Sequence, residues 1–170
     1  MLDLLIEPAK IFFEKGIDAY RKTQEHKNLR VAVQDRIRRE VRFNVALLNE
    51  FVTEKNGTAK HEDAIRGGLI KSLRTMAFDD ADSGIVPMTL FFDEELMTDV
   101  WPVRGFEAAQ EKYKGWVKSL ETQYDLLERT YHRIRIARTF AECGKVHGDI
   151  DYIRFLLIAC EKSLVASKVK

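Results

Sequence analysis

The chain has 170 residues, of which 28 are Lys or Arg and 27 are Asp or Glu, so its formal net charge at pH 7 is only +1. A hydrophobic content of 45% and a charged content of 32% suit a folded globular protein and argue against disorder. The near-zero charge removes the simplest electrostatic signature of a nucleic-acid or membrane-surface binder. No apolar run is long enough to span a membrane, and no signal peptide is recognisable, so we expect a cytoplasmic protein.

The distribution of Gly and Pro indicates an all-α fold. The sequence has nine Gly and only three Pro, and both residue types interrupt regular structure. No stretch shows the sustained alternation of apolar and polar residues that is typical of a strand. Long segments without breakers, in which apolar residues recur three and four positions apart, therefore predict helices.

The first predicted hairpin covers residues 8–78. Pro8 begins a long helix that is either continuous or interrupted near Asn28, where the sequence is polar on all sides. An Asn-Gly pair at 56–57 ends this helix. A shorter helix with a buried apolar stripe then extends to about Phe78.

An acidic crossover over residues 79–104 leads to the second predicted hairpin, over residues 105–168. The crossover is expected to contain a short helix capped by Asp93. The hairpin begins with a long helix over residues 106–142, in which Trp116 belongs to the buried stripe, and ends with a shorter helix. Together the two hairpins predict a single domain over residues 1–170, an antiparallel four-helix bundle of two long-short hairpins.

The charges are unevenly distributed along the chain. Residues 21–42 carry eight basic groups against three acids, residues 129–145 carry five against one, and residues 79–107 carry eight acids against one base. Three interpretations stay open: a solvated surface with ion pairs along each helix, a partnership of the acidic segment 79–99 with basic groups inside or between protomers, and a phosphate-binding belt. The belt would consist of Arg36, Arg39, Arg42, Arg129 and Arg133.

Motifs for catalysis and for metal or phosphate binding are incomplete. His61 begins a His-Glu-x-x segment that lacks the second histidine of a zinc peptidase helix, and no histidine follows the Glu-x-x-His pattern of di-iron bundles. The acidic run at 79–84 does not place oxygen ligands at the positions of a calcium loop. We therefore expect no cofactor, no metal site, no small-molecule ligand and a protein that is not an enzyme.

The two cysteines are expected to be free thiols. A hairpin that folds about residue 146 separates Cys143 from Cys160 by roughly 15 Å along the helix axis, farther than a disulfide spans. The same hairpin places Cys160 opposite His132. This admits a thiolate–imidazole dyad, but it favours a buried apolar thiol.

The N-terminal end predicts an interaction surface. Because the first helix is longer than its partners, its apolar end should overhang and be covered by residues 85–104, by a second copy or by another protein. The residues assigned to this surface are Leu5, Ile6, Phe12, Phe13 and Trp101. The favoured hypothesis is a non-enzymatic interaction or regulatory subunit that forms a homo-oligomer or joins a protein complex. The alternative is a nucleic-acid-binding bundle that uses the arginine belt.

Overall fold

The computed structural model describes residues 16–53, 59–96, 100–101, 103–107, 109–145 and 150–166. Within these ranges all regular structure is helical and no strand occurs, so the predicted all-α class is confirmed. The elements are α2 (Ile17–Arg21), α3 (Gln24–Thr53), α4 (Ala59–Ser72), α5 (Met76–Asp82), the 3-10 helix η1 (Met88–Phe91), α6 (Gln110–Val117), α7 (Gln123–Glu142) and α8 (Ile150–Ala166). None of the described helices is long and apolar enough to cross a membrane.

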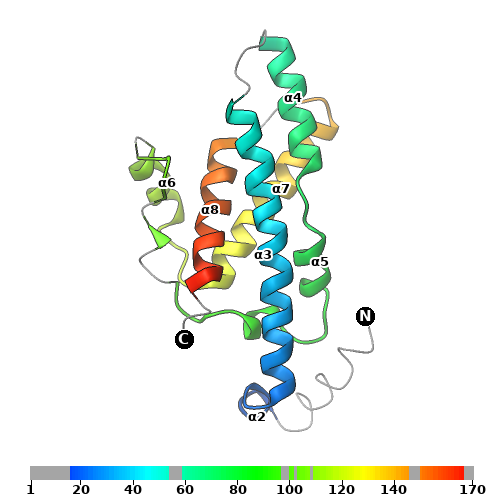
Figure 1. Ribbon diagram of the computed structural model, residues 1–170, viewed down its shortest axis with the longest axis vertical. Helices are drawn as coiled ribbons and strands as arrows, with labels where there is room; N and C mark the ends of the chain where they lie inside the picture. The colour runs from blue at the N-terminus through cyan, green and yellow to red at the C-terminus, as the bar shows by residue number, and fades with distance from the viewer. Residues whose placement is uncertain are drawn as a thin grey trace.

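The longest helix, α3, runs through the centre of the fold (Figure 1). It packs along α8 and also contacts α5 and η1, while α7 packs against both α4 and α8. The apolar side chains that these helices bury form one cluster with those of the connecting segments. Tyr20, Ile37, Tyr131 and Phe155 are completely buried in this cluster, so the core reaches from α2 to α8.

Three predicted helix boundaries are wrong. The first long helix is interrupted at residues 22–23 rather than near Asn28. The helix predicted to reach Phe78 is interrupted at residues 73–75, and the helix predicted over residues 106–142 is interrupted at residues 118–122. At the second and third interruptions the apolar spacing continues across the break, so periodicity alone cannot reveal these two.

Side chains of α3 organise the interruption between α4 and α5. The Asn44 amide donates to the Arg74 carbonyl at 2.8 Å, and its oxygen accepts from the Arg74 N–H at 2.8 Å. The carboxylate of Glu40 then accepts from the N–H groups of Ala77 at 2.9 Å and Phe78 at 3.4 Å. Glu40 thus caps the N-terminus of α5, where the free N–H groups of a helix need acceptors.

The second interruption ends in a capping box that starts α7. The Thr122 hydroxyl accepts from the Asp125 N–H at 3.0 Å, and the Asp125 carboxylate accepts from the Thr122 N–H at 2.8 Å. This reciprocal pair satisfies backbone donors at the new N-terminus and favours a fresh start of the helix. The Thr-x-x-Asp spacing was visible in the sequence and could have predicted this boundary.

The crossover covers the first turns of α3. The Gln34 amide donates to the Phe91 carbonyl at 2.7 Å, and His26 Nε2 lies 3.1 Å from the Leu90 carbonyl oxygen. Residues 88–91 form η1 and residues 93–96 are not helical, so the helix predicted after Asp93 is wrong over this part. The predicted helix also covered residues 97–101. Of these, residues 97–99 lie outside the described residues, and residue 101 is not helical. Residues 90 and 91 thus cover one flank of the first turns of α3, whereas the apolar overhang predicted before residue 16 lies outside the described residues.

Candidate functional site

The acidic crossover forms ion pairs with three of the eight basic groups of the first basic stretch. Three arginines of the N-terminal half and one of α7 form ion pairs with acids between residues 79 and 94. The pairs are Arg21–Glu94 at 2.8 Å, Arg30–Asp93 at 2.5 Å, Arg36–Asp80 at 2.5 Å, and Arg135–Asp79. An internal partnership between the acidic segment and the basic groups, one of the three interpretations of the charge pattern, is confirmed for these pairs.

The structure divides the five arginines of the predicted belt into two groups. On α3, Arg36 pairs with Asp80 of α5, whereas Arg42 pairs with Glu161 of α8 at 2.8 Å. Arg39 lies exposed on the same helix. The remaining two arginines of the belt lie on α7 and line a hollow that the three arginines of α3 do not line.

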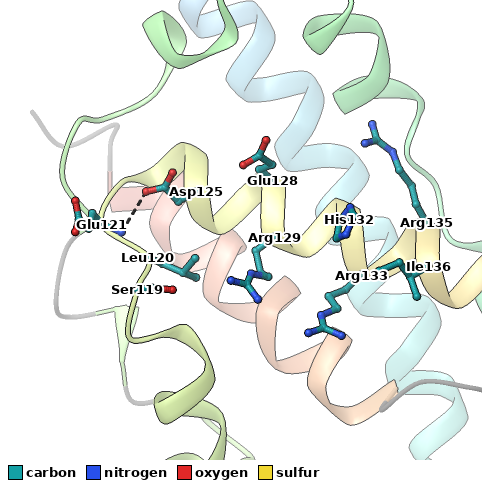
Figure 2. A pocket seen from close by; sticks show the side chains of 10 residues that line it. All are labelled: Ser119, Leu120, Glu121, Asp125, Glu128, Arg129, His132, Arg133, Arg135 and Ile136. Atoms are coloured by element: carbon teal, nitrogen blue, oxygen red, sulfur yellow. Dashed lines mark hydrogen bonds between the residues drawn. The ribbon is translucent and has the colours of Figure 1, made fainter.

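Arg129 and Arg133 lie one turn apart on α7. They line a hollow of about 730 Å³ together with Ser119 and Leu120 of the α6–α7 connection. Figure 2 shows both guanidinium groups extending from the same side of α7 towards α8, whereas Glu128 projects to the other side. Within the described part of the chain, no ion pair links either guanidinium group to a carboxylate.

An acid at the end of this hollow is already engaged. The Asp125 carboxylate accepts from the N–H groups of Glu121 at 3.2 Å and Thr122 at 2.8 Å. Its charge therefore stabilises the N-terminus of α7, where the helix dipole favours an anion. Glu121, Glu128 and Arg135 also line the hollow, so its lining combines three carboxylates with three arginines.

Tyr152 lies next to Arg133 and links it to a second aromatic ring. Arg133 Cζ is 5.7 Å from the ring centroid of Tyr152 on α8, and the Tyr152 ring meets Trp116 of α6 edge-to-face at 4.9 Å. Trp116 is 45% exposed, and Lys112 Nζ lies 4.9 Å from its ring centroid. We call these five residues, Lys112, Trp116, Arg129, Arg133 and Tyr152, the α6–α7 face.

Sequence reasoning missed this juxtaposition for a definite reason. It placed Trp116 in the buried stripe of one continuous helix, and that assignment is wrong because the helix breaks at residues 118–122. The break frees α6 to take its own direction, so Trp116 meets the first turn of α8 instead of following α7. The capping-box pattern at 122–125 was the one sequence signal that could have indicated the break.

The alternative of a Cys160–His132 dyad is not realised in the structure. Cys160 is completely buried, and its Sγ lies 3.2 Å from the Thr130 hydroxyl. Burial raises the pKa of this thiol to about 12, which disfavours the thiolate that a nucleophile requires. His132 lines the hollow on α7 instead, because Thr130 rather than His132 lies on the face of α7 that packs against Cys160. The expected buried thiol is confirmed, and Cys143 and Cys160 are both free.

The residues predicted to bind a protein partner are mostly beyond the described ranges. Leu5, Ile6, Phe12 and Phe13 lie outside the described residues. Trp101 is half-buried and stacks on Phe155 of α8 at 5.3 Å, so its ring contributes to the chain's own packing.

The described side chains contain no group of three or more His, Cys, Asp or Glu residues that could hold a metal ion. In comparisons with known proteins, no family model, no curated protein and no solved structure matches the chain.

Proposed function

We propose that the protein is a non-enzymatic nucleic-acid-binding helical protein that holds a phosphodiester backbone against Arg129 and Arg133. The observation that supports this proposal is the contrast between two sets of arginines. Four arginines of α2, α3 and α7 face carboxylates of the crossover, whereas Arg129 and Arg133 face the hollow beside α7.

The spacing of this pair suits a chain of phosphates. Residues four apart on a helix have Cβ atoms about 5–6 Å apart, so two long guanidinium side chains can reach successive phosphates of one strand. A guanidinium group also presents its N–H donors in a planar fork that matches phosphate oxygens. Since the net charge of the chain is only +1, affinity should depend on this local pair and fall with added salt.

The proposal is tested by removing the pair and comparing an equal loss of charge elsewhere. In the test variant Arg129 and Arg133 are both replaced by Gln; in the control variant Arg36 and Arg42, which are ion-paired, are replaced by Gln. Binding of a fluorescein-labelled single-stranded 20-mer is measured by anisotropy between 50 and 200 mM NaCl, and circular dichroism verifies that both variants fold.

The two variants should differ clearly. Loss of Arg129 and Arg133 should weaken binding about tenfold and flatten the slope of log K against log salt by about 1.4, because each single-strand phosphate contact contributes about 0.7. The Arg36 and Arg42 variant should change affinity less than about twofold. Equal losses in both variants, or the absence of oligonucleotide binding by the native chain, would overturn the proposal.

The contacts among the long helices support a finer architectural proposal. The helix pairs α3–α8, α8–α7, α7–α4 and α3–α4 are each in contact. These four pairings are those expected if α3, α4, α7 and α8 form the antiparallel four-helix bundle that the sequence predicts.

A second candidate function is self-association through the end of the molecule that contains α2. In Figure 1, α2 and the first turns of α3 extend beyond the ends of α7 and α8. Two apolar side chains at this end, Ile17 and Val31, are 46% and 54% exposed. Exposed apolar groups at a projecting end favour an interface between two copies of the chain.

Val31 offers a clean test of this second function because its exposure makes it dispensable for folding. If two copies associate here, Val31→Asp should convert a dimer into a monomer in light scattering coupled to size exclusion. Ile85→Asp is the matched control, since Ile85 is also exposed, at 59%, but lies in the crossover. A native chain that is monomeric at about 100 µM, or dissociation by both variants alike, would contradict it.

A further inference from the structure

We infer that the α6–α7 face takes nucleic acid as a single strand, with a base stacked on Trp116 and the neighbouring phosphates on Arg129 and Arg133. This inference rests on the proposed function and specifies the form of nucleic acid that the site accepts.

Trp116 presents an aromatic surface that is both exposed and fixed in place. Its ring is 45% exposed, yet it contacts Tyr152 at 4.9 Å and Tyr113 at 5.4 Å between ring centroids. Tyr113 and Tyr152 are themselves buried and pack on Phe155 of α8. A stacking surface held by a packed aromatic cluster loses little side-chain freedom when a ligand binds.

The stacking surface and the phosphate-binding pair meet at one residue. Tyr152 contacts Trp116 on α6 and lies beneath the guanidinium group of Arg133 on α7. Ser119, which lines the hollow with Arg129, follows Trp116 by three residues. A strand that lies along this face can therefore place a base on the indole while its backbone follows the arginines.

The charge around Trp116 matches a polyanion. Residues 110–118 carry three lysines and one glutamate, and one of the lysines, Lys112, lies over the indole ring. Basic groups that track a backbone, combined with aromatic rings on which bases stack, are the usual means of binding single strands without sequence preference.

Duplexes and acidic peptides fit this face less well. The bases of a duplex are stacked on one another, so only its phosphates could contact the protein. An acidic peptide could pair with the arginines but has no planar base for the exposed indole. Stacking on Trp116 therefore separates a single strand from both alternatives.

Tryptophan fluorescence can report this contact directly. The chain has two tryptophans, and Trp101→Phe leaves Trp116 as the only one. The Trp101→Phe protein is titrated with a deoxythymidine 12-mer, with a hairpin duplex of equal phosphate number, and with poly-glutamate. Affinities are measured in parallel for Trp116→Ala, for Trp116→Phe, and for the double Gln variant of Arg129 and Arg133, after circular dichroism has verified their folds.

The single strand should quench Trp116, and the duplex should bind more weakly with little quenching. Trp116→Ala should weaken single-strand binding on the order of tenfold, as expected for one stacked base, and Trp116→Phe should recover most of that loss. Duplex binding as tight as single-strand binding, with no effect of Trp116→Ala but loss on removal of the arginines, would overturn this inference and leave the proposed function intact. Quenching by poly-glutamate at equal charge, or no binding of any oligonucleotide, would overturn both.

Discussion

Glu40 joins three helices through one buried carboxylate. This carboxylate of α3 accepts hydrogen bonds from the N–H groups of Ala77 and Phe78 at the start of α5. It also accepts a hydrogen bond from the Tyr131 hydroxyl of α7 at 2.9 Å. Burial, followed by the nearby charge of Glu40, raises the pKa of Tyr131 well above its ordinary value, so the phenol stays protonated and donates.

We predict that Glu40→Gln lowers the free energy of unfolding by about 2 kcal/mol, because an amide NH₂ would face a donor and leave buried polar groups unpaired. Urea unfolding followed by circular dichroism measures this loss. Tyr131→Phe is the graded control: it removes one of the three hydrogen bonds and should lower stability by about 1 kcal/mol. A Glu40→Gln protein as stable as the native chain would contradict the capping role.

His26 lies in a segment that the sequence presents as polar on all sides, yet its ring is buried. It packs edge-on against Tyr20 at 5.0 Å and stacks on Phe91 at 5.9 Å. The burial could not be predicted from local sequence, because the covering residue Leu90 is 64 positions away. A polar segment can therefore be enclosed by a distant crossover without any change in its own pattern.

Burial should make the stability of this region depend on pH. It lowers the pKa of His26 below its ordinary value of 6.5, and the charges of Arg30 and Arg21 add to this effect, although the Leu90 carbonyl opposes it. The unfolded chain then binds the proton more readily, so stability is full above pH 6.5 and declines as pH falls towards the folded pKa.

The measurement for His26 is the unfolding free energy at pH 7.5 and at pH 5.5. We expect the native chain to lose stability on acidification and His26→Gln to lose less, because glutamine can still donate to Leu90 but does not titrate. Identical pH dependence in the two proteins would mean that His26 is not the sensitive group.

At the level of elements, the long helices were predictable from the sequence, whereas the interruption at residues 73–75 was not. The sequence indicated the long helices α3, α4, α7 and α8 correctly, because apolar spacing is a local property, whereas the short helix predicted after Asp93 is wrong over residues 93–96. The break at residues 73–75 depends on Asn44, which reaches the backbone of Arg74 from 30 positions away. Such a contact exists only after the hairpin has formed, so no local pattern announces it.

The reciprocal hydrogen bonds of Asn44 make it the critical residue of this break. We predict that Asn44→Ala lowers the free energy of unfolding by about 2 kcal/mol, since it leaves both backbone groups of Arg74 without their partner. Asn49 lies on the same helix but is exposed, and its side-chain oxygen accepts from the Arg154 side chain at 2.7 Å. Asn49→Ala should therefore cost less than about 0.5 kcal/mol, and equal losses in the two variants would refute this account of the break.

For the whole molecule, the charge blocks were legible in the sequence but their partners were not. Exposed ion pairs such as Arg36–Asp80 add little stability individually. These ion pairs nevertheless engage basic residues of α3 with carboxylates. For this reason the candidate site is placed at the arginines of α7 that form no such pair among the described residues. The position of Trp116 in the site could not be predicted for a related reason. It depends on the direction of α6, which the break at residues 118–122 separates from α7.

Cys160 can report on opening of the whole core. It lies at 0% exposure in the same cluster as the residues of α3 and α7, and its thiol pKa is raised to about 12. A modifying reagent can reach it only when this core opens, and core positions open with a free energy close to that of global unfolding. Cys143, in contrast, is exposed and free.

We therefore predict that a disulfide reagent at pH 8 modifies one thiol of the native chain rapidly, and that Cys143→Ser abolishes this rapid phase. The remaining labelling of Cys160 should be at least about a thousandfold slower than in denaturant, as expected for a domain stable by 5 kcal/mol or more. Cys160→Ser, which keeps the exposed thiol, should retain the rapid phase unchanged. Rapid labelling of Cys160 in a Cys143→Ser protein with native circular dichroism would mean that the core between α7 and α8 opens locally, and that the two helices do not behave as one cooperative unit.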